Sequence, residues 1–174
     1  LAELSDFTIE RFERRGVKSA LIYNLPRREN RSASPAKRPK KFKIILNGHL
    51  DIIPAKPEQF KPQVKGQRLY GAGAMDMKAN VACLIAAFKA VAGKVNYPLG
   101  LQLVTDEEIG GFNGTKFQVE QGVRADFVLA GEPTNFDIVH KAKGILQVRV
   151  SVRGRAAHGA YPWQGENAVL KMTA

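Results

Sequence analysis

The sequence predicts an α/β fold, in which a mostly parallel sheet is flanked by helices. Short apolar runs bounded by breaker residues alternate along residues 1–143 with segments long enough to form helices. Strands that alternate with helices in this way form parallel sheets covered on both faces. Acidic and polar motifs also lie at the junctions between the expected elements, which is where α/β proteins build their sites. The composition, with 44% apolar and 25% charged residues, is that of an ordinary globular protein.

The first third of the chain predicts one helix and two strands. Residues 1–15 carry apolar residues at helix-like spacing between charged ones and end before Gly16, which predicts an amphipathic helix. Residues 19–25 and 42–46 are short apolar runs bounded by breakers, as strands are. The charged segment between these two runs is expected to be a loop.

The middle of the chain predicts a long helix followed by two strands and a short helix. Residues 77–92 are apolar almost all round and are followed by Gly93, so we expect a buried helix. Cys83 lies inside this run and is predicted to be a small core residue. The later elements, in chain order, are a strand, a short helix closed by Gly122, and a strand: residues 99–104, 114–121 and 127–130.

The pattern changes at Gly144. In residues 145–153 apolar side chains alternate with polar ones, which predicts a strand with one solvated face in an antiparallel sheet. We therefore expect a first domain over residues 1–143 and the beginning of a second domain over residues 144–174.

The formal net charge of +11 is concentrated in one segment. Between Arg27 and Lys43, eight basic residues stand against Glu29 alone, a net charge of +7. Residues 27–41 also contain Pro and Ser and no aromatic side chain, so we interpret them as a solvated surface loop. A nucleic-acid-binding arm is the alternative, but the segment offers no base-stacking platform.

Four motifs bear histidine or acidic side chains, and they occupy residues 47–55, 71–78, 105–111 and 130–134. In the first motif His49 and Asp51 directly follow an apolar run, and side chains two positions apart in an extended chain share one side. An imidazole and a carboxylate placed so can form a metal ligand and the group that orients it. An isolated histidine at a strand end is usually a surface or core residue, and Glu107-Glu108 alone would be a solvated turn. Four such segments in order favour a metal site.

These four segments, in this order, resemble the M20 family of metallopeptidases and deacylases, which includes acetylornithine deacetylase and succinyl-diaminopimelate desuccinylase. The resemblance covers nearly the whole chain. It implies part of a zinc-peptidase-like catalytic domain in residues 1–143 and the start of an α+β lid and dimerisation domain in residues 144–174. It further implies hydrolysis of an amide bond in a small N-acylated amino acid or peptide, by a water activated between two divalent metals.

The resemblance also assigns roles to individual residues. His49 and Glu132 would hold one ion, Glu108 would hold the other, and Asp76 would bridge both. Glu107 would act as general base, and Asp51 would hydrogen-bond the ring of His49. The nitrogen and oxygen donors suit zinc, with cobalt or manganese as tolerated substitutes.

Two further histidines lie in the second half of the chain. By the resemblance, His158 would reach the active site of a partner subunit and stabilise the oxyanion of the tetrahedral intermediate, which implies a homodimer formed through the lid. Without the resemblance His158 would be a loop histidine. His140 has no motif around it, and we interpret it as structural.

The family also takes its last metal ligand, a histidine, from a segment after the lid, and none of the three histidines of this chain matches it. We therefore expect an incomplete chain that is inactive by itself. A non-catalytic scaffold with an incomplete metal site is the alternative, and a basic nucleic-acid-binding module is a weaker one. No apolar run reaches the roughly 20 residues that span a bilayer, and residues 1–6 lack a signal-peptide pattern. We expect a cytoplasmic protein with no membrane or nucleic-acid partner.

Overall fold

The computed structural model describes residues 4–25, 37–146 and 148–173. The chain divides into two units, Leu1–Asp137 and Ile138–Ala174. Most of the predicted basic loop, residues 27–36, lies outside the described residues.

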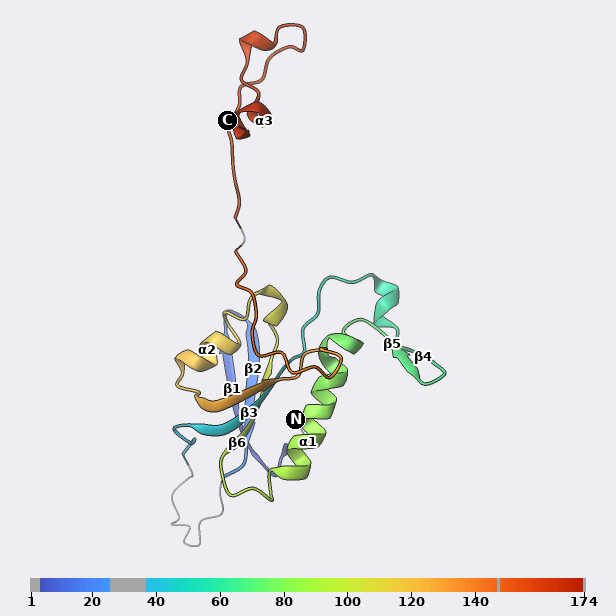
Figure 1. Ribbon diagram of the computed structural model, residues 1–174, viewed down its shortest axis with the longest axis vertical. Helices are drawn as coiled ribbons and strands as arrows, with labels where there is room; N and C mark the ends of the chain where they lie inside the picture. The colour runs from blue at the N-terminus through green and yellow to red at the C-terminus, as the bar shows by residue number, and fades with distance from the viewer. Residues whose placement is uncertain (1–3, 26–36, 147, 174) are drawn as a thin grey trace. The chain divides into compact units, whose positions relative to one another are not determined.

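A five-stranded sheet forms the centre of the first unit (Figure 1). In chain order its strands are β1 (Thr8–Arg14), β2 (Val17–Tyr23), β3 (Phe42–His49), β6 (Leu99–Val104) and β7 (Ala125–Ala130). They lie side by side in the order β1-β2-β6-β3-β7. β3 runs parallel to β6 and to β7, whereas β2 is antiparallel to both β6 and β1. The predicted α/β class is confirmed, with a sheet that is mixed because an antiparallel hairpin forms one edge.

The predicted helix over residues 1–15 is wrong, because β1 occupies residues 8–14. Arg15 and Gly16 have φ angles of 52° and 80° and form a two-residue turn. Two consecutive positive φ angles are typical of hairpin turns, whose twist matches that of the strands they join. Ile9 and Phe12, three residues apart, then pack on opposite faces of the sheet, in two separate clusters. The apolar spacing that suggested one face of a helix therefore belongs to a strand whose two faces are both packed.

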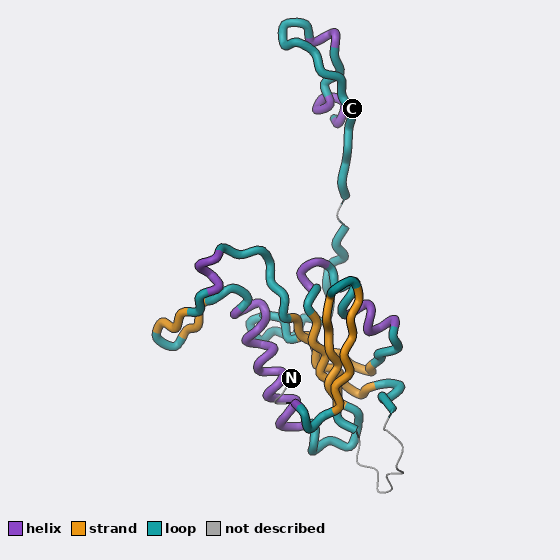
Figure 2. The backbone as a smooth tube through the Cα atoms, turned by 180° about the vertical axis from the view of Figure 1, so that it is seen from behind, coloured by secondary structure: helices purple, strands orange, loops and turns teal. Residues whose placement is uncertain are grey.

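Helices cover both faces of the sheet (Figure 2). α1 (Ala79–Val91) packs Leu84 and Phe88 against apolar residues of β2 and β6. α2 (Thr115–Glu120) lies on the other face, where Phe117 meets Phe12 edge to face with ring centroids 6.4 Å apart. The long helix, the short helix and the strands predicted for this region are confirmed, with ends that differ by a few residues.

Cys83 is exposed, so its prediction as a core residue is wrong. The buried side chains of α1 are Val81, Leu84 and Phe88, whose spacing defines one stripe facing the sheet. Cys83 lies off this stripe. The run of small apolar residues in the sequence suggested a helix buried on all sides, but only one side of α1 is buried.

Short elements connect the helices and strands of the first unit. They are η2 (Pro57–Phe60), β4 (Gln63–Lys65), β5 (Arg68–Tyr70), η3 (Ala74–Lys78) and η4 (Glu107–Ile109). β4 and β5 pair antiparallel as a separate hairpin whose residues are all exposed.

The second unit holds little regular structure. Its described elements are η5 (Pro162–Gln164) and α3 (Ala168–Met172), which Asn167 caps by accepting from the backbone N–H of Val169. The predicted strand over residues 145–153 is wrong for the described residues, none of which forms a strand there. Ile145, Leu146, Val148 and Val150 are 64–88% exposed. An alternating pattern needs a paired strand and a core to cover its apolar side, and the described part of this unit supplies neither. Within the described residues, no helix is both long and apolar enough to cross a membrane.

Candidate metal centre

The carboxyl ends of the three parallel strands meet at one edge of the sheet, and three of the four motifs follow those ends. His49 is the last residue of β3 and is in register with Val104, the last residue of β6. Asn47 is in register with Ala130 at the end of β7, and its carbonyl accepts from the N–H of Gly131 at 3.0 Å. Residues placed directly after parallel strands converge on a common edge, so the topology itself brings the motifs together.

His49 lies at the centre of this edge and is only 1% exposed. Its Nδ1 is 3.1 Å from the carbonyl oxygen of Asp51, and its Nε2 is 3.1 Å from Oδ1 of Asp76. A neutral imidazole can donate through one nitrogen only. Two oxygens at the ring are therefore satisfied by a doubly protonated ring, by a proton on the Asp76 carboxyl, or by a cation between Nε2 and Asp76.

Four carboxylates lie close to the ring of His49: those of Asp76, Glu107, Glu108 and Glu132. Ligand atoms of His49, Glu107 and Glu132 all lie within 4.8 Å of one another, and so do those of His49, Asp76 and Glu108. The nearest oxygens of Glu107 and Glu132 are each 3.9 Å from Nε2. One imidazole nitrogen with several carboxylate oxygens is a donor set that fits zinc and similar divalent ions. All four predicted ligands, together with the predicted base, thus gather in one place.

The crowding of these carboxylates changes their acidity. Burial raises the pKa of Glu107 and of Glu132, and repulsion from neighbouring carboxylates raises both further, against the opposing effect of His49. Burial lowers the pKa of His49, but hydrogen bonds to Asp51 and Asp76 and nearby negative charge leave the pKa raised overall. Without a cation, the cluster favours protonation. A divalent ion would remove that preference by neutralising the negative charge.

Asp51 contacts both His49 and the acidic motif after β6. Its carbonyl is the nearest acceptor to Nδ1 of His49, while its carboxylate oxygen Oδ1 lies at 3.4 Å. Its other oxygen, Oδ2, accepts from the backbone N–H of Glu108 at 3.0 Å. The resemblance implied a hydrogen bond from the His49 ring to Asp51; the structure gives it to the backbone carbonyl, while Oδ1 has no hydrogen-bond partner among the described residues. The link to Glu108 was not predicted.

Glycines make room where the chain approaches α1. A Cβ on Gly48 would lie 2.7 Å from Val81, and one on Gly131 would lie 2.8 Å from Leu84. Gly73 has a φ of 69°, and a Cβ there would lie 2.2 Å from Ile52. Gly48 and Gly131 thus let the ends of β3 and β7 come close to α1, whereas Gly73 lets the Asp76 motif pack against Ile52.

The two other histidines, His158 and His140, belong to the second unit. The Nδ1 of His158 accepts from the N–H of Ala160 at 3.2 Å, and its ring centroid is 5.8 Å from that of Tyr161. Its role in an active site stays a prediction. His140 is exposed. Sequence reasoning missed Asp106, which is buried directly before the Glu107-Glu108 pair.

The described end of the basic segment takes part in the fold. Arg38 pairs with Glu10 at 2.7 Å, and Lys41 and Lys43 both pair with Asp126. These ion pairs link the start of β3 to β1 and β7, which gives the three cations a structural role.

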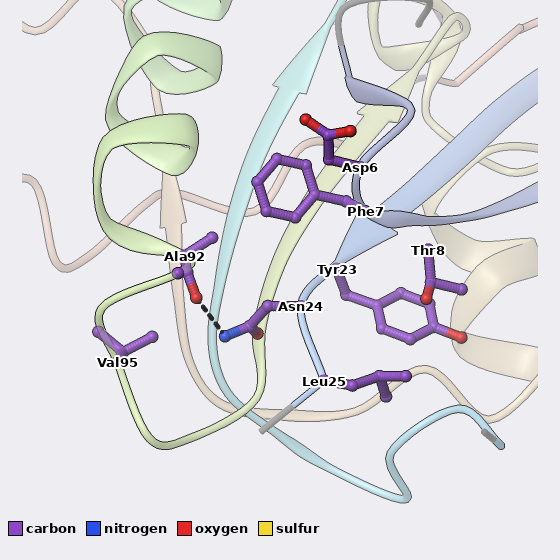
Figure 3. Close-up of a pocket in the computed structure, with 9 residues that line it drawn as sticks. Asp6, Phe7, Thr8, Tyr23, Asn24, Leu25, Ala92 and Val95 are labelled. Atoms are coloured by element: carbon purple, nitrogen blue, oxygen red, sulfur yellow. Dashed lines mark hydrogen bonds between the residues drawn. The ribbon is translucent and has the colours of Figure 1, made fainter. Parts of the chain in front are cut away.

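A cavity of about 360 Å³ lies at the opposite end of the sheet from the metal cluster, where β2 ends and β6 begins (Figure 3). Asn24 lines this cavity, and its side chain forms hydrogen bonds with three backbone groups. Its amide donates to the carbonyl of Ala92 at 2.7 Å and to that of Tyr97 at 3.3 Å, and its oxygen accepts from the N–H of Leu99 at 2.7 Å.

The chain is similar to known proteins over most of its length. The family described as "Peptidase family M20/M25/M40" matches residues 45–171. The succinyl-diaminopimelate desuccinylase of Acidovorax ebreus (strain TPSY) is 35% identical over 144 residues, covering 72% of this chain and 37% of that protein. A probable carboxypeptidase of Paracoccidioides brasiliensis (strain Pb03) is 36% identical over 141 residues, covering 75% of this chain and 32% of that protein. The crystal structure of human carnosine dipeptidase 1 matches with a TM-score of 0.49 and 18% identity, over 74% of this chain and 30% of that one. The chain therefore spans about a third of the length of the two curated relatives.

Proposed function

This chain belongs to peptidase family M20/M25/M40, and from that membership we propose that the complete protein hydrolyses the amide bond of a small N-acylated amino acid or peptide. The single observation that carries the proposal is the cluster of His49 with four carboxylates at the carboxyl edge of the sheet. The names of its relatives, a desuccinylase and probable carboxypeptidases, support this substrate class. We propose zinc as the metal, with cobalt or manganese as substitutes.

Metal ions held by His49, Asp76, Glu108 and Glu132 would supply a Lewis acid for the substrate carbonyl and would make a water more acidic. Glu107 would accept the proton of the attacking water and pass it to the leaving nitrogen. Burial raises the pKa of Glu107 above its ordinary value, and a base works best when its pKa lies closer to the working pH. Asp51 holds His49 in the tautomer that leaves Nε2 free for the metal.

The division of roles between Glu107 and Glu108 rests on the resemblance to the family. Both side chains lie within ligand distance of His49, each in a different group of three. The assignment of His49, Asp76, Glu108 and Glu132 as ligands and of Glu107 as base is therefore a proposal. The two roles predict different effects of mutating Glu107 and Glu108.

We also propose that residues 144–174 begin a lid through which the complete protein dimerises, so that His158 serves the active site of the partner subunit. The support is the position of His158 in the segment that resembles the family's lid. Sedimentation of the complete protein tests this: a monomer at micromolar concentration would contradict the proposal. A cytoplasmic location likewise stays a prediction from the sequence.

The experiment that tests the metal site is elemental analysis of the folded 174-residue chain, after zinc loading and removal of free metal. We expect about one zinc per chain. The matched control is His49→Ala, which removes the nitrogen donor and should retain none. A folded wild-type chain without zinc would overturn the proposed metal site and favour a non-catalytic scaffold.

A further inference from the structure

Asp106 joins the two ends of the loop that carries Glu107 and Glu108 through hydrogen bonds. Its carboxylate oxygen Oδ2 accepts from the backbone N–H groups of Asn113, at 2.8 Å, and Gly114, at 3.0 Å. Its backbone carbonyl accepts from the N–H of Gly111 at 2.7 Å. Asp106, at the start of the loop, therefore holds its middle through its backbone carbonyl and its end through its carboxylate.

Asp106 is enclosed, with 1% of its surface exposed. A Cβ on Gly114 would lie 2.1 Å from its Oδ1, so the carboxylate packs directly against the backbone where the loop turns into α2. Oδ1 has no hydrogen-bond partner among the described residues. The position of the enclosed carboxylate is therefore set through Oδ2, by its two hydrogen bonds from the loop backbone.

The loop places two side chains of the metal cluster. Between its closed ends, Glu107 extends to 3.9 Å from Nε2 of His49, and Glu108 reaches the group with Asp76. On the other side, Asp51 accepts from the N–H of Glu108. Asp51 thus fixes one point within the loop, whereas Asp106 fixes its closure.

We propose that Asp106 is a positioning residue for the metal cluster: by closing the loop from residue 106 to residue 114, it holds the carboxylates of Glu107 and Glu108 where they face His49. This inference rests on the proposed metal-dependent function. Among the described residues, the hydrogen bonds of the Asp106 carboxylate go to backbone groups of its own loop, so it acts through the two glutamates and not on the substrate or the metal.

The test is zinc affinity of the complete protein, measured by competition with a chromophoric chelator, together with thermal unfolding. We expect Asp106→Ala to weaken zinc binding about tenfold or more, as loss of a group that orients a ligand commonly does. Asp106→Asn keeps one oxygen that can accept from Asn113 and Gly114, and it should recover most of the affinity.

The matched control is Asn24→Ala. Asn24 is also buried and also joins backbone groups, but it lies at the far end of β6 (Figure 3). We expect it to lower the unfolding temperature while zinc affinity stays at the wild-type value. Wild-type affinity in folded Asp106→Ala, or an equal loss of affinity in Asn24→Ala, would overturn the inference.

A second variant tests the inference if Asp106→Ala does not fold. Gly114→Ala keeps the carboxylate but displaces it, and we expect the same loss of zinc affinity. Unchanged affinity in this variant would contradict the role of Asp106. Failure of the proposed function looks different: a wild-type protein that binds zinc but hydrolyses no amide would refute the activity, while the affinity comparison would still decide the role of Asp106.

Discussion

The cluster around His49 depends on single side chains whose roles differ although they lie side by side. Glu107 and Glu108 are neighbours in the chain, yet each joins His49 in a different group of possible ligands. His49, Asp76, Glu107, Glu108 and Glu132 could be proposed from the sequence because their motifs lie beside expected elements and resemble those of a known family.

Asp106 could not be found in the same way. An aspartate before two glutamates looks like one more solvated acid, and only the folded loop shows that its carboxylate turns inward to backbone N–H groups. The reach of Asp51 to the N–H of Glu108 was hidden for the same reason, since it joins residues far apart in the sequence.

The proposed roles predict different losses for the two glutamates. In the complete protein, Glu107→Ala should abolish turnover and leave the zinc content unchanged, because a general base is not needed to hold the metal. Glu108→Ala should lower the zinc content, because it removes a ligand. Elemental analysis and hydrolysis of an N-acylated amino acid measure both effects. Loss of zinc in Glu107→Ala would refute the assignment of Glu107 as base.

At the scale of elements, the apolar runs that became β2, β3, β6 and β7 were recognisable because these strands are short and bounded by breakers. β1 was not, because its identity depends on a turn and a partner strand. The alternation in residues 145–153 was a pattern for a sheet, and the described residues of the second unit contain no strand to pair with it.

The hairpin of β1 and β2 gives a prediction about Gly16. Its φ of 80° is costly for any residue with a Cβ, although the space around it is open. Gly16→Ala should therefore lower the free energy of unfolding by about 1 kcal/mol, as measured by denaturant unfolding. Gly93→Ala is the matched control, since its surroundings are also open but its φ is not in the left-handed region. Equal stability in the two variants would contradict the importance of the turn.

The stripe on α1 gives a second prediction at this scale. Phe88 is fully buried against the sheet, and Phe88→Ala should cost about 3–5 kcal/mol of unfolding free energy. Cys83 is exposed on the same helix, and Cys83→Ser should change stability by no more than about 0.5 kcal/mol. Native Cys83 should also react readily with a thiol reagent in this chain. A thiol that becomes reactive only in denaturant would show that it is buried after all.

Across the whole molecule, the fold gathers negative charge at one edge of an otherwise basic protein. The net charge is +11, yet the edge around His49 holds four carboxylates. The parallel pairing of β3 with β6 and β7 brings three of these carboxylates to His49, because it places the ends of the three strands together, and η3 adds the fourth, Asp76. Without a metal, these carboxylates repel one another because the sheet topology holds them together. This repulsion should lower the free energy of unfolding of the whole protein.

This cost predicts how the stability of the metal-free protein depends on pH. The pKa values of Glu107 and Glu132 are raised in the folded state above the ordinary 4.5 of a glutamate. A group with a raised folded pKa contributes stability that is fully present below its unfolded pKa and is lost as the pH rises through its folded pKa. The raised pKa of His49 acts with the same sign above its ordinary 6.5. The contribution of the cluster should therefore fall from about pH 4.5 upward, through neutral pH.

The variant that isolates this effect carries Glu107→Gln together with Glu132→Gln. At pH 4 both glutamates of the wild type are largely protonated, so the two metal-free proteins should unfold at similar temperatures. At pH 7 the variant should be the more stable, because it lacks the two carboxylates that repel their neighbours. Zinc should reverse that order at pH 7, since it binds the ionised wild-type cluster and stabilises it. A metal-free variant less stable than the wild type at pH 7 would mean that the carboxylates stabilise the fold without a cation, and the electrostatic argument for a metal at this edge would fail.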